Sequence, residues 1–226
     1  MFYKNARIFT GDFQFHTGAF EVTNGLFGRI LPEDVPEDAI DLQGATVIPG
    51  LVEVHSHGNS GADFSDGSYE GLKAMAKYYA ACGATSFAPT SMTLPYDILS
   101  KAFATAKQLK DEAPEGHARI MGIQMEGPYF SYKKRGAQNP DYLMTPDFEG
   151  FKELYDACGG MIRIVDIAPE LPVPQNLWPE PASFAQSPSP TPTAATTMPA
   201  PRWMPVSLIW SICTMPCPPS TTAIPV

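Results

Sequence analysis

The chain has 226 residues, of which 44% are hydrophobic and 17% are charged, and its formal net charge is −9. This composition predicts a soluble globular protein of one sizeable domain or a small domain plus part of another, and the acidic balance argues against a broad nucleic-acid or membrane-surface footprint. No apolar run approaches the ~18 residues of a membrane span, no secretory signal pattern opens the chain and the four cysteines are scattered, so we expect a cytoplasmic protein.

The composition changes abruptly near residue 171. Residues 172–226 hold 14 of the 24 prolines, all three tryptophans and none of the 18 glycines, and their charged residues are Glu180 and Arg202. Proline interrupts helices and central strands alike. We therefore predict a largely irregular C-terminal tail over residues 172–226 that does not continue the preceding fold.

Residues 2–30 alternate short apolar runs with turn signals such as Gly11-Asp12 and Asn24-Gly25. This pattern is typical of hairpins, and it predicts a small β-region over residues 1–44 that forms part of a β-sandwich. The apolar stretch over residues 45–54, which ends at His55, then predicts a buried strand.

Strands and helices alternate over residues 45–171. Further predicted strands cover residues 85–90, 119–125 and 161–168. Three intervening helices are indicated by apolar residues at helical spacing, namely Leu72, Met75, Ala76, Tyr79 and Ala80; Leu99, Ala102, Phe103 and Ala106; and Phe148, Phe151, Tyr155 and Cys158. This order predicts a parallel α/β architecture, and we favour the first half of a (β/α) barrel.

Glycine and proline mark the expected ends of these helices. Gly83 follows the first helix, and Pro95 begins the second. Thr145 is the expected N-cap of the third helix, with Pro146 in its first turn.

Two histidines and a glutamate stand where predicted strands end. His55 and His57 point the same way if the chain is extended, and Glu126 ends the third strand. Barrel enzymes place their sites at the carboxyl ends of the strands, and imidazole with carboxylate suits borderline divalent metals. The three residues therefore predict a metal site; alternatively, they are surface histidines in a loop and a solvated turn glutamate.

Lys133, Lys134 and Arg135 form the single basic cluster of this acidic chain. The cluster follows Glu126 closely and would suit an anionic group such as phosphate. Alternatively, it is a solvated loop.

Several segments carry a resemblance to a known family. PGLVEVHSHG at 49–58 resembles the first barrel strand of the amidohydrolase superfamily. GIQMEGPY at 122–129 followed by KRGAQNP at 134–140 is similar to the N-acetylglucosamine-6-phosphate deacetylase family, as are GATSFAPT at 83–90 and APE at 168–170. The resemblance covers about residues 1–171.

This resemblance implies a TIM-like, metal-dependent hydrolase barrel that converts N-acetylglucosamine 6-phosphate to glucosamine 6-phosphate and acetate in amino-sugar catabolism. It implies one or two divalent metals, zinc or iron, with Glu126 as the principal ligand and His55 and His57 at a second metal position. Ala137 falls on a substrate-contacting backbone position, and Gln138 stands where the family usually has His. The expected partner is the small amino-sugar phosphate, with no nucleic acid and no membrane, and the intact enzyme is expected to be a homodimer.

The family's two further histidine ligands and catalytic Asp would follow residue 171, where this sequence has neither His nor Asp. In another reading frame, the codons from Pro172 onward permit a sequence that contains AHTD and HLYNAM, which resemble the family's fifth and sixth strands. We therefore predict that residues 172–226 are a frameshift product. A half-barrel would keep open strand edges, so the chain as written is expected to be poorly folded, truncated and inactive, with no catalytic residue present.

Two other functions remain open at this point. One is a cyclic-amide hydrolase of the same superfamily, against which the segment Arg135–Pro140 argues. The other is a non-catalytic fragment whose proline-rich tail binds partners.

Overall fold

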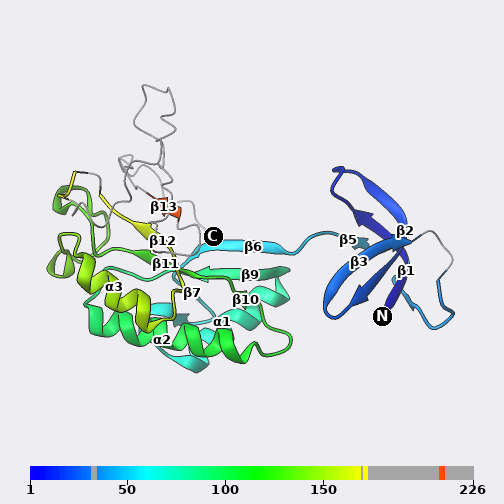
Figure 1. Ribbon diagram of the computed structural model, residues 1–226, viewed down its shortest axis with the longest axis horizontal. Helices are drawn as coiled ribbons and strands as arrows, with labels where there is room; N and C mark the ends of the chain where they lie inside the picture. The colour runs from blue at the N-terminus through cyan, green and yellow to red at the C-terminus, as the bar shows by residue number, and fades with distance from the viewer. Residues whose placement is uncertain (32–34, 169, 173–208, 212–226) are drawn as a thin grey trace, which may run out of the picture. The chain divides into compact units, whose positions relative to one another are not determined.

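The computed structural model describes residues 1–31, 35–168, 170–172 and 209–211 (Figure 1). The chain divides into two compact units, Met1–Gly50 and Leu51–Val226. Within the described residues, no helix is long and apolar enough to cross a membrane. Most of the predicted irregular tail lies outside the described residues. Its residues 209–211 form the short strand β13, which pairs with β12, so the prediction that the tail does not continue the preceding fold is wrong at these residues.

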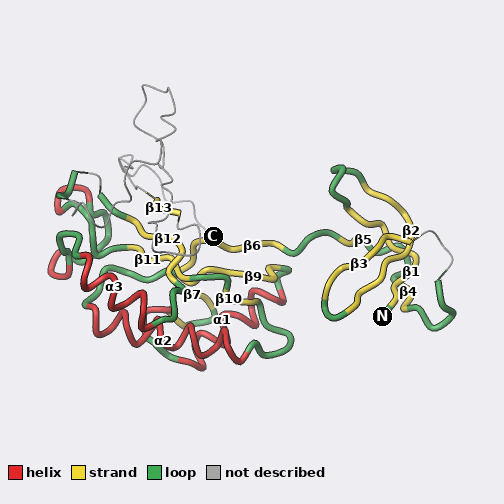
Figure 2. Tube along the Cα trace, viewed as in Figure 1, coloured by secondary structure: helices red, strands yellow, loops and turns green. Residues whose placement is uncertain are grey.

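The first unit is a five-stranded sheet in the order β3-β2-β1-β4, in which β5 also pairs with β1 (Figure 2). Its strands are β1 (Phe2–Phe9), β2 (Phe15–Thr23), β3 (Leu26–Leu31), β4 (Ile40–Asp41) and β5 (Thr46–Val47). Asn24 and Gly25 have φ values of 53° and 73°, as the two-residue hairpin turn between β2 and β3 requires. The first unit is therefore a β-sheet, with Ala6, Ile8 and Phe20 at its core.

The predicted strand over residues 45–54 is wrong in its continuity and its burial. Thr46 pairs with Arg7 in the first unit, and a second strand, β6 (Leu51–Ser56), begins after Gly50 in the other unit. Pro49 separates them, since proline has no amide hydrogen to donate to a ladder. β6 is exposed rather than buried: the side chain of Val54, for example, is 50% exposed. The reason is that, among the described residues, β6 is the edge strand of its sheet.

The second unit has two parallel sheets with three helices on one side of them (Figure 1), and a short antiparallel pair, β7 (Gly58–Asn59) and β8 (Ala62–Asp63), follows β6. One sheet has the order β10-β9-β6, the other the order β11-β12-β13, and a bridge between Thr90 and Gln124 joins them. This is the expected alternation of strands and helices, and the mixed α/β class is confirmed. The elements are α1 (Tyr69–Ala81), β9 (Ala84–Pro89), α2 (Tyr96–Glu112), β10 (Arg119–Ile120), β11 (Ile123–Glu126), α3 (Phe148–Ala157), β12 (Ile162–Asp166) and β13 (Ile209–Ser211).

The third predicted strand is interrupted after Ile120. β10 pairs with β9, whereas β11 pairs with β12. Gly122 lies at the break, and a side chain there would come within 2.1 Å of the Arg163 side chain. The interruption lets the chain pass from one sheet to the next and carries Glu126 to the end of β11.

The third helix begins two residues later than the sequence predicts. Its N-cap is Asp147, whose carboxylate accepts hydrogen bonds from the backbone N–H groups of Glu149 and Gly150, both at 3.2 Å. The prediction of Thr145 as the cap is therefore wrong. Asp147 satisfies two of the free N–H groups of the first turn, and the helix starts at Phe148.

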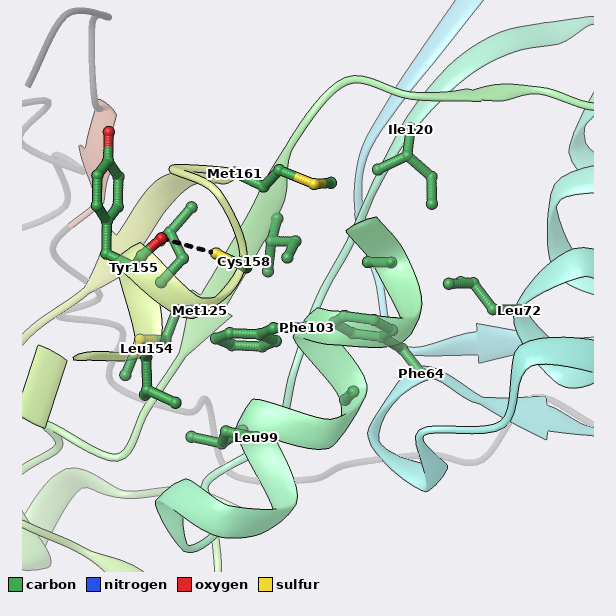
Figure 3. Close-up of a cluster of buried hydrophobic side chains, with 14 of the residues drawn as sticks. Phe64, Leu72, Leu99, Phe103, Ile120, Met125, Leu154, Tyr155, Cys158 and Met161 are labelled. Atoms are coloured by element: carbon green, nitrogen blue, oxygen red, sulfur yellow. Dashed lines mark hydrogen bonds between the residues drawn. The ribbon is translucent and has the colours of Figure 1, made fainter. Parts of the chain in front are cut away.

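The core of the second unit lies between the helices and the strands (Figure 3). Phe103 of α2 stacks on Phe64, with ring centroids 6.0 Å apart. Cys158 donates a hydrogen bond to the carbonyl oxygen of Tyr155, and burial raises the pKa of its thiol. This core fixes the strands whose carboxyl ends carry the candidate site.

Candidate metal centre

The structure brings together the three residues that the sequence singled out as metal ligands. His55 is the penultimate residue of β6, His57 directly follows that strand, and Glu126 ends β11. Oε2 of Glu126 lies 3.3 Å from Nε2 of His55 and 3.2 Å from Nε2 of His57. One ligand atom from each residue lies within 4.8 Å of the other two, so the group could hold a metal ion.

Hydrogen bonds behind the two imidazoles set their tautomers. Nδ1 of His57 lies 3.1 Å from the carbonyl oxygen of Thr90, and Nδ1 of His55 lies 3.1 Å from Oε1 of Gln124. Since both partners are acceptors, a neutral imidazole at either position carries its proton on Nδ1 and leaves the lone pair of Nε2 free for a metal ion. Both lone pairs are therefore available at the point that Glu126 approaches.

A buried polar chain extends from His55 into the next strand. Nε2 of Gln124 donates to Oδ2 of Asp166 at 2.8 Å, which turns Oε1 of the same amide toward His55. Such outer partners orient a ligand imidazole. Sequence reasoning did not single out Gln124, Asp166 or Thr90. One signal was present: Gln124 is polar in an apolar strand and shares a face with Glu126 two residues later.

The second oxygen of Glu126 is held by a loop residue. Oε1 of Glu126 accepts a hydrogen bond from Nε2 of Gln138 at 2.9 Å, and Oε1 of Gln138 accepts one from the backbone N–H of Thr93, also at 2.9 Å. Gln138 is buried and adjoins Glu126, whereas Ala137 beside it is exposed.

The charges of the site favour an ionised carboxylate. Burial alone would raise the pKa of Glu126, but its contacts with His57, His55 and Gln138 together outweigh burial and hold the pKa below its ordinary value. The same contact with Glu126 is the largest cause that raises the pKa of His57. Glu126 is therefore an anionic ligand at neutral pH.

The donor set suits a divalent metal ion. It offers two imidazole nitrogens and one carboxylate oxygen, and Oε2 of Glu126 is buried without an aligned hydrogen-bond donor. With metal–ligand bonds of ~2.1 Å, neighbouring ligand atoms around a tetrahedral ion stand ~3.4 Å apart. The separations of 3.2 and 3.3 Å from Oε2 to the two Nε2 atoms come close to that spacing.

The basic cluster lies on the loop between Glu126 and Gln138. Lys133 and Lys134 belong to a short 3-10 helix, η2 (Tyr132–Lys134), and are exposed. Arg135 instead packs over the ring of Tyr132 at 4.3 Å and donates to its carbonyl oxygen. The two lysines are therefore the members of the cluster whose charges face solvent.

Gly127 lets the chain turn sharply after Glu126. Its φ is +78°, and a Cβ there would come within 2.1 Å of Oγ1 of Thr93, the residue that anchors Gln138. We expect Gly127→Ala to displace this anchor and to weaken Co²⁺ binding by roughly 10- to 100-fold, as losses of a ligand's supporting contacts do. Spectroscopic titration of the metal-free chain measures the change.

Gly136→Ala is the matched control for this substitution. Gly136 also has a positive φ, +61°, but nothing lies within 4 Å of an added Cβ. The Gly136→Ala substitution therefore introduces similar backbone strain without a clash. The Co²⁺ affinity of this variant should stay close to that of the unsubstituted chain. Equal losses of Co²⁺ affinity in Gly127→Ala and Gly136→Ala would show that backbone strain alone causes the effect.

Comparison with known proteins identifies relatives over part of the chain. No protein-family model matches the sequence. The N-acetylglucosamine-6-phosphate deacetylase of Bacillus subtilis is 36% identical over 128 residues, which are 56% of this chain and 32% of that protein. The human enzyme of the same name is 33% identical over 157 residues, 64% of this chain and 38% of that protein. The chain thus spans about a third of the length of these relatives.

Solved structures agree with the sequence relatives. The deacetylase of Pasteurella multocida matches with a TM-score of 0.69 and 29% identity, over 78% of this chain and 47% of that one. A mutant of the Mycobacterium smegmatis enzyme, solved in complex with N-acetyl-D-glucosamine-6-phosphate, matches with a TM-score of 0.65 and 27% identity, over 76% of this chain and 44% of that one.

The parallel strands and the His-His-Glu group at their carboxyl ends accordingly form part of an amidohydrolase-type α/β structure. The resemblance noted in the sequence is confirmed at this level. The chain is a partial homologue of the N-acetylglucosamine-6-phosphate deacetylases.

Proposed function

We propose that this chain represents the first part of a metal-dependent deacetylase that hydrolyses N-acetylglucosamine 6-phosphate to glucosamine 6-phosphate and acetate. The observation that carries the proposal is the convergence of His55, His57 and Glu126, with both Nδ1 atoms engaged behind the site. The relatives support the substrate, since one was solved with N-acetyl-D-glucosamine-6-phosphate.

Each residue of the site has a proposed role. His55, His57 and Glu126 would hold one or two divalent ions, zinc or iron. A bound ion acidifies water and polarises the amide carbonyl. Ala137, which is exposed, is the candidate for backbone contact with the substrate, and the neighbouring Gln138 is the second candidate.

Lys133 and Lys134 would attract the phosphate of the substrate, a role supported by their exposure on the loop that leads away from Glu126. Their charges would act in an otherwise acidic chain. We further propose that the intact enzyme is cytoplasmic and forms a homodimer.

The tail requires a separate proposal. The sequence has no His or Asp after residue 171, so the catalytic acid–base carboxylate and two further metal ligands of the family have no counterpart in this chain. We propose that the gene shifts frame near Pro172 and that residues 172–226 are its product. Sequencing across the codons for Leu171 to Val173 tests this, because one base gained or lost there reopens the frame.

Activity of the frame-restored chain tests the proposed function. We expect acetate release from N-acetylglucosamine 6-phosphate, its loss on treatment with a chelator and its return with Zn²⁺ or Fe²⁺. A cyclic amide such as dihydrouracil should not be opened. Opening of the cyclic amide without acetate release would favour the other amidohydrolase class, and metal-independent turnover would exclude the proposed chemistry.

A further inference from the structure

Gln138 is tied at both ends of its side-chain amide. It is 7% exposed, its Nε2 donates to Oε1 of Glu126, and its Oε1 accepts from the backbone N–H of Thr93. Its own backbone N–H donates to the carbonyl oxygen of Arg135 at 3.1 Å. The residue therefore connects the chain after β9 to the loop after β11, and little of it can move independently.

The contact with Gln138 makes the two oxygens of Glu126 unequal. Oε1 faces an amide donor, whereas Oε2 faces Nε2 of His55 and Nε2 of His57. A carboxylate without such a partner is free to rotate about its last torsion, which is broad, and either oxygen or both can then face a metal. The hydrogen bond selects one orientation.

We propose that Gln138 is a positioning residue that makes Glu126 bind its metal through Oε2 alone. The inference rests on the metal-binding part of the proposed function and does not depend on the substrate. Through Thr93, the same contact links the geometry of the metal centre to the segment that follows β9.

Few side chains can take the place of this glutamine. The site needs a donor toward Glu126 and an acceptor toward Thr93, and a primary amide offers both. A neutral imidazole also has one donor and one acceptor nitrogen. Methionine has similar length but no donor, and an ionised glutamate has acceptors only and would place a second negative charge beside Glu126.

The test is titration of the metal-free 226-residue chain with Co²⁺, followed by visible absorption. We expect Gln138→Met and Gln138→Glu each to weaken Co²⁺ binding by roughly 10- to 100-fold and to change the intensity of the cobalt bands as the carboxylate turns. Gln138→His should restore both affinity and spectrum. Gln108→Met, at an exposed position on α2, should change neither.

The outcomes separate the inference from the proposed function. If the unsubstituted chain binds Co²⁺ while Gln138→Met and Gln138→Glu keep its affinity and spectrum, the positioning role is wrong and the metal centre stands. If the unsubstituted chain is folded by circular dichroism and binds no Co²⁺, the metal centre fails as well; if it is unfolded, the same titrations on the frame-restored protein decide both questions. Circular dichroism identifies a variant that does not fold. If Gln138→Met is such a variant, the comparison of Gln138→Glu with Gln138→His decides. Failure of Gln138→His to restore Co²⁺ binding also contradicts the proposal.

Discussion

Glu126→Gln is expected to weaken binding of a divalent metal by more than about 100-fold, beyond the range for losing a residue that only supports a ligand. The substitution keeps the shape of the side chain but removes its negative charge. The new amide NH₂ group can also turn toward the two Nε2 atoms, which lie 3.2 and 3.3 Å from Oε2 of Glu126, and donate hydrogen bonds to the lone pairs that would bind the metal. Calorimetric titration of the metal-free chain with Zn²⁺ measures the loss.

Glu115→Gln is the control for this effect. It removes the same charge from an exposed position outside the His-His-Glu group. We expect the Zn²⁺ affinity of this variant to stay within about threefold of that of the unsubstituted chain, because screened surface charges contribute little. If Glu126→Gln also kept its Zn²⁺ affinity within about threefold of that of the unsubstituted chain, the three residues would not form the metal centre.

The second large effect is expected from completing the chain. The frame-restored protein should release acetate from N-acetylglucosamine 6-phosphate at least about 10³-fold faster than the 226-residue chain, since a positioned general acid–base group alone contributes roughly 10²- to 10⁴-fold. The proposed frame-restored protein would supply an Asp and two histidines after residue 171, where the 226-residue sequence has neither. A coupled assay for acetate, run on both proteins with Zn²⁺ added, compares the two rates.

Completion of the chain should also raise stability. Leu51, Val52 and Val54 of β6 are 58%, 52% and 50% exposed, although apolar strand residues are typical of covered sheets. We expect the urea midpoint of the frame-restored protein to be clearly higher and its transition more cooperative. Equal midpoints and measurable deacetylation by the 226-residue chain would contradict the interpretation of this chain as truncated and inactive.

Local patterns predicted the elements that carry the site. Apolar spacing predicted α1 and α2, and the run before Glu126 predicted the strand that ends there. The His-x-His spacing predicted that both imidazoles approach one point. These features depend on backbone geometry over a few residues, which is why the sequence alone was sufficient.

Other features depended on competition between neighbouring groups. Thr145 and Asp147 both suit a helix N-cap, and Asp147 was selected because its carboxylate reaches two backbone N–H groups of the first turn. The break between β10 and β11 came from pairing with two different strands, β9 and β12. Neither feature can be predicted from the local pattern, because each depends on which groups the folded chain brings into contact.

By itself, the sequence determined the order of strands and helices, the two histidines and glutamate at strand ends, and the family that these motifs resemble. The tertiary structure decided how those ligands are held, through Gln124 with Asp166 behind His55 and through Gln138 with Thr93 behind Glu126. The physical reason is that strand-end motifs follow from the alternation of side chains along a strand. Supporting hydrogen bonds instead join residues far apart in the chain, and only the register and packing of the folded strands bring them within reach.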